Sequence, residues 1–358
     1  MQTKYQRIME IIKTKIQNEE WQPGDKIWSE REIADRYGVS RITVKKAIGE
    51  LTSQKYLEQR PGRRGTFIRE VELKSHISNL IGVVIDDVTD SFGAQLLRGI
   101  EDYLWKHKFH TVVCNVDRNY DKVSQYISSL IETQIAGVIF APVIDHEYEQ
   151  NNRKIINLLE NERLPYVLID RFIPEVPSSY VISDYRESIG SITKYLLSKG
   201  HERILLLVGL ECTTMTEGLM GYFDAHHEAG IPCNEDLIIS SNDNLLRDSI
   251  HSNEMIDLKK AIEKVGSFSA LIALNDRLLK AGLLILLDLG IEVGKDVELA
   301  AHDDVTNTYP PYTSNIPMVL EPTYEMGWES AKILIDSIRK PGRAIVRIML
   351  KSKVITDN

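Results

Sequence analysis

The sequence predicts a small α+β domain at its N-terminal end, followed by a larger α/β part with two parallel sheets. Three observations carry this prediction. Residues 1–70 show three amphipathic helical stretches and then two short β-type runs, whereas from residue 80 apolar runs alternate with helical segments. The charge also changes sign between the parts: residues 1–70 hold 15 basic and 10 acidic residues, and residues 71–358 hold 28 basic and 42 acidic residues.

The composition is that of an ordinary globular protein, with 43% apolar and 27% charged residues and a net charge of −9 over 358 residues. The longest aliphatic run, Ile204–Val208, is too short for a membrane helix. The N-terminal segment lacks the apolar block and cleavage site of a signal peptide. Three dispersed cysteines, Cys114, Cys212 and Cys233, indicate a reduced, cytoplasmic protein without a disulfide framework.

The first predicted helix carries isoleucines at helical spacing, Ile8, Ile11, Ile12 and Ile16, and should end before Pro23-Gly24. A second helix should start at Ser29, because Glu32 three residues later completes a capping box. It should end at Gly38.

A third helix, capped by Ser40, presents a core face to the second. That face consists of Val44, Ala47, Ile48 and Leu51. Two helices joined by the short turn Gly38-Val39 form a helix-turn-helix, whose second helix places its N-terminal residues against base edges. In this chain those residues are Ser40, Arg41, Thr43 and Lys45.

A basic hairpin follows the third helix. The pattern predicts two short strands, Tyr56–Arg60 and Gly65–Ile68, joined by a turn whose tip carries Arg60, Arg63 and Arg64. Such a wing can enter a minor groove or bind phosphates. The alternative is that these charges form a solvated surface, as most charge runs do. The capped helix pair together with an arginine-tipped hairpin favours nucleic acid.

The segment PGDKIWSEREIADRYGVSRITVKKAIGELTSQKYLEQRPGRRGTFI resembles the GntR-type winged-helix domain. The resemblance implies DNA contacts by one residue of the Glu30-Arg31 pair and by the wing-tip Gly62, in addition to Arg41, Thr43 and Lys45. It also places Tyr5 near phosphate. Many relatives have arginine where this chain has Lys45, and lysine lacks the bidentate fork that reads guanine.

In the body, continuous apolar strands separated by helices predict parallel sheets covered on both faces. These strands are Ile81–Ile85, Thr111–Cys114, Gly137–Ala141, Tyr166–Ile169, Ile204–Val208, Ala270–Leu274 and Val297–Ala301. About 280 residues are too many for one such sheet and fit two halves with a cleft at the carboxyl ends of their strands. The predicted boundaries are a winged helix at 1–70, a linker at 71–79 and a ligand-binding part at 80–358. Its first subdomain is expected at about 80–170 and 305–340, and its second at about 171–304 and 341–358.

The motifs of common enzyme classes are missing from the sequence. It contains no Gly-x-Gly-x-x-Gly, no Gly-x-x-x-x-Gly-Lys-Ser/Thr, no Gly-x-Ser-x-Gly and no His/Cys cluster with zinc spacing. We therefore predict no catalytic residues, no cofactor, no metal site and no enzymatic activity.

Residues 80–358 resemble the LacI/ribose-binding-protein-like family, which has the periplasmic-binding-protein fold. The motifs that carry this resemblance are Asp90-Ser91-Phe92, Val167–Arg171, Lys199–Ile204, Leu274-Asn275-Asp276, His302-Asp303-Asp304 and Pro322 through Gly327. The resemblance implies that Asp303 and Asn275 hold effector hydroxyls, with Asp90 and Phe92 on the opposite lip. It places Asp170 where the chain crosses between the halves and Glu321 where it crosses back. The alternative for each carboxylate is a loop cap or turn residue.

A GntR head on a LacI-like body resembles the arabinose-repressor class, which implies a dimeric, sugar-responsive bacterial repressor. One departure concerns Gly218, which stands where the family usually has a ligand-clamping arginine. Its absence argues against an acidic or phosphorylated effector. A neutral mono- or disaccharide, or an amine-bearing sugar, fits better.

The predicted function is therefore that of a ligand-controlled repressor. It is expected to dimerise through the half containing residues 80–170, so that two N-terminal domains bind the two half-sites of a palindromic operator. Several alternatives stay open. The effector could be a nucleobase, a nucleoside or another metabolite, and the protein could activate rather than repress. A transport-type binding protein without a regulatory role and an enzyme fused to a DNA reader are the remaining rivals.

Overall fold

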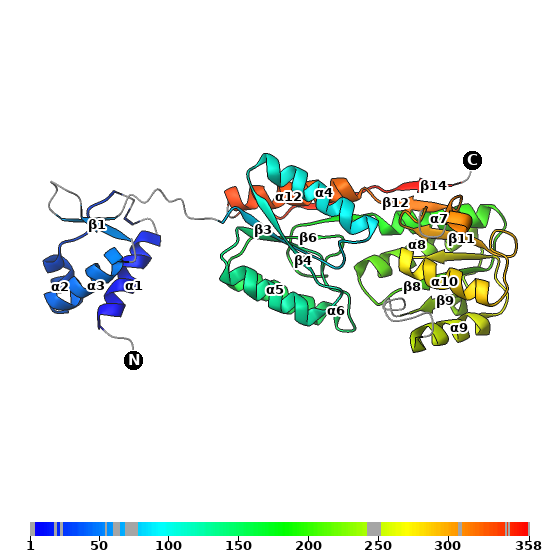
Figure 1. The fold of residues 1–358 in the computed structure, drawn as a ribbon, viewed down its shortest axis with the longest axis horizontal. Helices are drawn as coiled ribbons and strands as arrows, with labels where there is room; N and C mark the ends of the chain where they lie inside the picture. Colours follow the sequence, from blue (N-terminus) through cyan, green and yellow to red (C-terminus); the bar gives the residue numbers. More distant parts are fainter. Residues whose placement is uncertain are drawn as a thin grey trace. The chain divides into compact units, whose positions relative to one another are not determined.

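The computed structural model describes residues 4–17, 20–21, 24–53, 56–59, 65–68, 78–241, 252–306, 310–340, 342 and 344–356. The chain divides into two compact units, Met1–Ile77 and Ser78–Asn358 (Figure 1). Over the described residues, no helix has the length and apolarity needed to cross a membrane.

The first unit is a three-helix domain with a small hairpin. Its elements are α1 (Lys4–Gln17), α2 (Glu30–Tyr37), α3 (Arg41–Ser53), β1 (Leu57–Gln59) and β2 (Thr66–Ile68), and the two strands pair antiparallel. Ile8 and Ile12 of α1, Ile33 of α2 and the predicted inner face of α3 are buried together, so the amphipathic pattern specified this core correctly.

The turn between α2 and α3 has the local chemistry that the sequence predicted. Ser29 and Glu32 form the capping box, and Gly38 ends α2 with a φ of 63°, a left-handed conformation that glycine adopts without a steric penalty. The Ser40 hydroxyl accepts the Thr43 N–H at 3.2 Å and so caps α3. These caps set the angle between the two helices.

The second unit begins with a six-stranded, all-parallel sheet in the order β13-β7-β6-β5-β3-β4. Helices α4 and α12 lie on one face and α5 and α6 on the other (Figure 1). The strands are β3 (Leu80–Ile85), β4 (His110–Asn115), β5 (Gly137–Phe140), β6 (Tyr166–Ile169), β7 (Tyr180–Ser183) and β13 (Arg347–Leu350). The helices are α4 (Ser91–Lys106), α5 (Tyr120–Glu132), α6 (Tyr148–Asn161) and α12 (Thr323–Arg339).

A second six-stranded sheet has the order β14-β12-β11-β10-β8-β9 and is parallel except for the β12–β14 pair. Its strands are β8 (Ile204–Val208), β9 (Ile238–Ser240), β10 (Ala270–Ala273), β11 (Glu298–His302), β12 (Met318–Leu320) and β14 (Lys353–Ile355). Its helices are α7 (Tyr185–Ser198), α8 (Thr213–Ala229), α9 (Asn253–Val265), α10 (Asp276–Asp288) and the short α11 (Pro310–Thr313), with a 3₁₀ turn at Glu235–Leu237. The predicted pair of parallel sheets is therefore present.

The chain crosses between these subdomains at places other than those expected. Strand β7 pairs with β6, so the first crossing lies after Ser183 and not at Asp170. Strand β12 belongs to the second sheet and β13 to the first, so the later crossings lie at residues 321–322 and 351–352. The expected boundaries at 170/171, 304/305 and 340/341 were wrong because β6 and β7 are parallel neighbours without a helix between them, an unusual connection. Glu321 does lie at a crossing, as predicted.

Facing glycines let α4 and α12 pack closely. A Cβ on Gly99 would lie 2.0 Å from the Tyr324 carbonyl oxygen, and one on Gly327 would lie 2.2 Å from the Leu96 carbonyl oxygen. Because these contacts are with backbone, no side-chain rotation relieves them. The two backbones therefore meet at a distance that only glycine permits, which fixes the position of the N-terminal end of α4.

Candidate functional site

The exposed face of α3 is the candidate nucleic-acid interface of the first unit. Arg41 and Lys45 are exposed and Thr43 is half-buried, while the opposite face of α3 is in the core. Ser40 is exposed, but its hydroxyl is engaged with Thr43 Oγ1 at 2.8 Å as well as with the helix amide. Ser40 therefore positions the start of α3, and Arg41 and Lys45 present the charges.

The remaining predicted DNA contacts surround this face or lie outside the described residues. Arg31 is exposed on α2 beside Asp35, at 3.8 Å, and Glu30 is half-buried. The ring of Tyr5 on α1 lies under the Lys46 ammonium, 4.3 Å from nitrogen to ring centroid. The wing-tip residues Arg60, Gly62, Arg63 and Arg64 lie outside the described residues.

One further side chain on this face is exposed although it is apolar. Ile42 is 82% exposed, between Arg41 and Thr43 at the start of α3. The sequence predicted no role for Ile42. An exposed apolar side chain on a helix that enters the major groove is suited to contact a thymine methyl group.

The second unit contains a pocket between its two subdomains. It encloses about 820 Å³ of space, part of it open to solvent. Its lining comes from the segments that follow β3, β4, β5, β6 and β7 in the first sheet and β8, β10, β11 and β12 in the second. All these segments stand at the carboxyl ends of parallel strands, where ligands of open α/β sheets bind.

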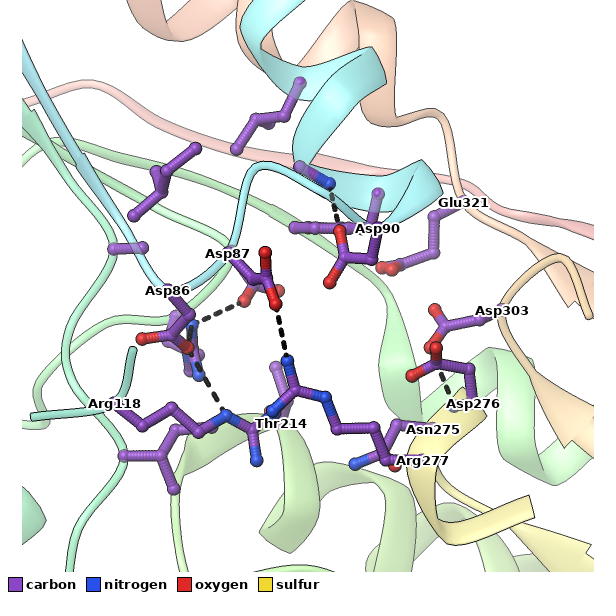
Figure 2. Close-up of a pocket in the computed structure, with 18 of the residues that line it drawn as sticks. Asp86, Asp87, Asp90, Arg118, Thr214, Asn275, Asp276, Arg277, Asp303 and Glu321 are labelled. Carbon is purple, nitrogen blue, oxygen red and sulfur yellow. Dashed lines mark hydrogen bonds and ion pairs between the residues drawn. The ribbon is translucent and has the colours of Figure 1, made fainter. Parts of the chain in front are cut away.

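All six residues predicted to bind the effector lie in the lining of this pocket, and four of them, Asp90, Asn275, Asp303 and Glu321, are labelled in Figure 2. The six are Asp90, Phe92, Asp170, Asn275, Asp303 and Glu321. The two lips come from different subdomains, because Asp90 and Phe92 belong to the start of α4 whereas Asn275 and Asp303 follow β10 and β11.

Two of the six also cap helices, which the sequence offered as the alternative for Asp90 but not for Asn275. The Asp90 Oδ1 atom accepts the Gly93 N–H at 2.6 Å, and the Asn275 Oδ1 atom accepts the Leu278 N–H at 2.8 Å. Capping fixes one oxygen of each side chain and orients the rest of the group toward the pocket. Structural and ligand-facing roles are therefore combined at these positions.

Ion pairs occupy one end of the pocket. Arg171 lies 2.9 Å from an oxygen of Asp86 and 3.1 Å from one of Asp170, and Arg118 approaches Asp86 at 3.7 Å. These contacts hold the pKa of Arg171 well above its usual value, although burial opposes its charge.

Another ion pair joins the two lips. Arg277 at the start of α10 lies 3.1 Å from Asp87, which follows β3, so this contact spans the two subdomains (Figure 2). Sequence reasoning missed the three arginines and their partners Asp86 and Asp87. Arg171 belongs to the motif Val167–Arg171 and also pairs with adjacent Asp170, but it was given no role. The pairs that involve Asp86 and Asp87 join residues remote in the chain, which no local motif marks.

Carboxylates without such partners occupy the other end. Burial raises the pKa of Asp90, and the negative charges of Asp276 and Asp87 add to the shift. Burial also raises the pKa of Asp303 well above its usual value, again with a contribution from Asp276. Figure 2 shows Asp90, Asp276 and Asp303 directed into the same part of the pocket.

Glu321 closes this end of the pocket at the second crossing. Its Oε1 atom accepts a hydrogen bond from the Ser183 hydroxyl at the first crossing, whereas Oε2 contacts no donor within the described residues. Burial raises the pKa of Glu321 to about 8, and neighbouring His302 opposes the shift. Glu321 thus links the connecting segments to the pocket wall.

A group of metal-ligand type lies beside this wall, where the sequence predicted no metal site. His302, Asp303 and Glu321 each offer one atom, and these atoms lie within 4.8 Å of one another. His302 is fully buried, and its ring stacks on Tyr185 with 3.9 Å between centroids. Burial lowers the pKa of His302, which favours the neutral ring.

Gly218, where the family usually has a clamp arginine, lies on α8 one turn after the lining residues Thr214 and Met215. Gly218 on α8 is buried, and a Cβ there would meet the Leu274 side chain at 3.1 Å. Gly218 is not part of the lining, whereas Arg118, Arg171 and Arg277 are. The absence of arginine at 218 therefore does not leave the pocket without guanidinium groups, and the expectation about effector charge stays a prediction.

Comparisons with known proteins match both units. Residues 4–68 match the model of the bacterial regulatory proteins of the gntR family, and residues 78–352 match that of the periplasmic binding proteins and sugar binding domain of the LacI family.

Similar proteins match over most of this chain and most of their own length. An arabinose metabolism transcriptional repressor of Halalkalibacterium halodurans is 25% identical over 348 residues, covering 95% of this chain and 90% of the relative. The probable HTH-type transcriptional regulator EndR of Paenibacillus polymyxa is 27% identical over 321 residues, covering 86% and 90%. A solved complex of the transcriptional regulator CelR with cellobiose superposes with a TM-score of 0.67 at 23% identity, covering 88% of this chain and 89% of that one.

The second-unit match spans most of the chain, and the first-unit match adds a regulatory DNA-binding domain. The chain therefore belongs to the family of periplasmic binding proteins and LacI sugar-binding domains, as a transcription regulator with a gntR-type head rather than an enzyme.

Proposed function

We propose that this protein is a repressor of carbohydrate-utilisation genes that leaves its operator when a sugar-class ligand binds between the subdomains of the second unit. The observation that carries this proposal is the pocket lined from both subdomains, with carboxylates, an amide and Phe92 converging on it. Carboxylates and amides form paired hydrogen bonds with hydroxyl groups, and an aromatic side chain suits the apolar face of a sugar ring. The name of the Halalkalibacterium relative points to the same ligand class.

The first unit would read the operator through α3. Arg41, Thr43 and Lys45 are proposed to face bases and adjacent phosphates, with Ser40 holding the helix start. Tyr5, Glu30 and Arg31, together with the wing-tip residues, are proposed to position the domain on the backbone. Such a regulator acts on the chromosome, so we place it in the cytoplasm.

A homodimer would present two first units to a palindromic operator. The proposed dimer surface lies on the first subdomain, where large apolar side chains are exposed on three consecutive elements: Trp105 on α4, Val113 on β4 and Tyr126 on α5. Strand β4 is also the edge of its sheet. Exposed apolar groups of this size are typical of interaction surfaces.

Ligand binding would act through the three crossings. A ligand that contacts both lips binds the closed arrangement of the subdomains better than the open one, and so shifts the population toward closure. If the closed dimer holds its first units at a spacing that does not fit the operator, affinity falls by the coupling free energy, typically about 1–3 kcal/mol.

The test is an operator titration. Duplexes selected in vitro by the full-length protein would be labelled, and binding followed by fluorescence anisotropy with a panel of pentoses, hexoses, disaccharides and nucleosides. At least one sugar should weaken operator binding about tenfold. If only nucleosides weaken it, the ligand is a nucleoside and not a sugar. No response to any member would contradict ligand control.

Asp303→Asn tests the pocket itself. We expect it to abolish release by the active sugar while leaving operator affinity unchanged, because it removes a charge from the pocket and nothing from the first unit. Asp304→Asn is the matched control, since Asp304 is the exposed neighbour outside the lining. Normal release by Asp303→Asn would remove Asp303 from the site.

A further inference from the structure

The charges that line the pocket do not balance. Seven acidic side chains and three arginines contribute to the lining. The arginines are already neutralised, because Arg171 pairs with Asp86 and Asp170, Arg118 with Asp86, and Arg277 with Asp87. Four acidic groups are left at the other end of the cavity, and these are Asp90, Asp276, Asp303 and Glu321.

Within the part of the chain that the structure describes, Asp90, Asp303 and Glu321 accept hydrogen bonds but form no ion pair with an arginine or lysine, and the charge of Arg277 lowers the pKa of Asp90 less than burial raises it. Asp90 accepts the Gly93 amide at 2.6 Å, and Asp303 accepts the Asp276 amide at 3.3 Å. Glu321 accepts the Ser183 hydroxyl. His302, whose Nδ1 atom lies 3.6 Å from Asp303, is fully buried, and burial lowers its pKa.

The groups also disfavour one another's charge. The pKa of Asp90 is raised by burial and then by Asp276, and the pKa of Asp303 is raised by burial and then by Asp276, Asp170 and Asp90. Carboxylates that face a common cavity with raised pKa values gain most from a cation placed between them. A neutral sugar supplies hydroxyl groups but leaves this repulsion in place.

The arrangement also spans the two lips. Asp90 belongs to the first subdomain, whereas Asp276 and Asp303 belong to the second, and all three side chains are directed into the same space (Figure 2). One protonated amine there would be attracted by both halves and would favour closure. Phe92, on the same lip as Asp90, offers an apolar surface to the carbon skeleton that carries the amine.

We propose that the ligand of this pocket is an amine-bearing polyol, such as an amino sugar, whose ammonium group is held by Asp90, Asp276 and Asp303. This inference rests on the proposed function, because it names the ligand class of the same pocket. The hydroxyl groups of the ligand then face the end of the pocket where the arginines and their aspartate partners lie.

Matched sugars test the amine directly. Calorimetric titration of the full-length protein would compare glucosamine, galactosamine, mannosamine and 1-amino-1-deoxyfructose with the parent sugars and with the N-acetyl derivatives of the first three. Within at least one set, the amine should bind about tenfold or more tightly than both its hydroxyl and its acetylated partner. The same amine should weaken operator binding.

Asp276→Asn should weaken binding of that amine about tenfold and change the affinity for its parent sugar less than twofold. Asp257→Asn, a surface variant on α9 of the same subdomain, should change neither. Equal loss for both sugars would mean that Asp276 binds no charge and would overturn the proposal.

Other outcomes separate the two proposals. A neutral sugar that binds as tightly as its amine partner, or more tightly, overturns the amine assignment and leaves a sugar-responsive regulator standing. If Mn²⁺ or Zn²⁺ binds saturably, this binding is lost in Asp276→Asn and no amine binds, the amine assignment is overturned and the site is a metal site. Failure of every sugar and every amine to bind contradicts both proposals.

Discussion

Two of the aspartates in the pocket have a positive backbone φ angle, which few residue types adopt without strain. Asp170 has a φ of 68° and Asp303 a φ of 95°, and both follow the last residue of a buried strand. Main-chain hydrogen bonds hold both residues in this conformation. The Asp170 N–H donates to the Val181 carbonyl oxygen at 3.0 Å, and the Asp303 N–H donates to the Val319 carbonyl oxygen at 3.1 Å. Aspartate and asparagine accept positive φ more readily than most residues, and strain of this kind is typical of binding sites. Asparagine is therefore the substitution that removes charge without adding strain.

Glu321 makes the stability of the second unit depend on pH. Its pKa is about 8 in the folded protein against 4.5 in an unfolded chain, so the folded state holds an extra proton between these values. The free energy of unfolding should therefore fall as pH rises from about 5 to about 8. Glu321→Gln should flatten this fall, as measured by urea unfolding across that range.

Glu325→Gln provides the control for this experiment, since Glu325 is exposed on α12 four residues away. It should leave the pH profile of the wild type unchanged. If Glu321→Gln had the same slope as the wild type, the buried carboxyl would not be the source of the pH dependence.

In the first unit, Arg41 is the residue whose substitution should most specifically change DNA sequence preference. Arg41→Ala should weaken binding to the selected operator by about 1–3 kcal/mol and relax the preference at one base pair. Anisotropy titrations on the operator and on single-base variants measure both effects. Lys260→Ala on exposed α9 should change neither, and unimpaired binding by Arg41→Ala would show that α3 is not the reading helix.

At this scale, sequence reasoning found pocket residues that local motifs mark and missed those that distant partners define. Asp90 and Asn275 stand at helix starts, and Asp303 follows a recognisable apolar strand. Asp87 has no such mark, because its role depends on Arg277, 190 positions along the chain. The surroundings of Gly218 could not be predicted for the same reason, since its neighbour Leu274 comes from another strand end.

Among the elements, the α4–α12 contact is the most sensitive to a small change. In Gly99→Ala, the new methyl group would meet the Tyr324 carbonyl oxygen and separate the helices. Overpacking of this kind destabilises by about 1–3 kcal/mol, and a backbone neighbour puts the effect at the upper end. Thermal unfolding should show a lower Tm for Gly99→Ala and an unchanged one for Gln95→Ala, which is exposed on the same helix. Equal Tm values would mean that the helices can shift apart freely.

Elements with strong periodic patterns were predictable, and short edge elements were not. The long apolar runs became β3, β5, β8 and β10 nearly as predicted. Strand β7 was missed because it has four residues and no helix before it, and β13 alternates exposed with half-buried residues at an edge of its sheet. The fold class followed from the runs, but the crossing points depended on these weak strands.

Across the whole second unit, the Arg277–Asp87 pair joins the two subdomains without any ligand. Each side chain is about one-fifth exposed, so the pair is only partly screened by solvent. A contact of this kind contributes about 1 kcal/mol, which is enough to change the ratio of closed to open forms about fivefold. Arg277→Ala should therefore increase the radius of gyration measured by small-angle scattering.

Arg186→Ala is the matched control for this prediction. Arg186 pairs with Asp224 at 2.6 Å, but both lie on helices of the second subdomain, α7 and α8. Its loss should leave the radius of gyration unchanged. An Arg277→Ala protein no larger than the wild type would show that the pair does not hold the lips together.

The interleaved order of the strands has a consequence for synthesis on the ribosome. Residues 1–77 form a compact unit and can fold as soon as they emerge. The first subdomain starts next, yet its sheet stays incomplete until β13 arrives, because Arg347–Leu350 pair with Tyr180–Ser183. Its outer helix α12 is also made only after nearly the whole second subdomain. The nascent chain therefore exposes an unpaired edge of β7 and an uncovered apolar face while the second subdomain is synthesised, which makes this half the one most dependent on chaperones.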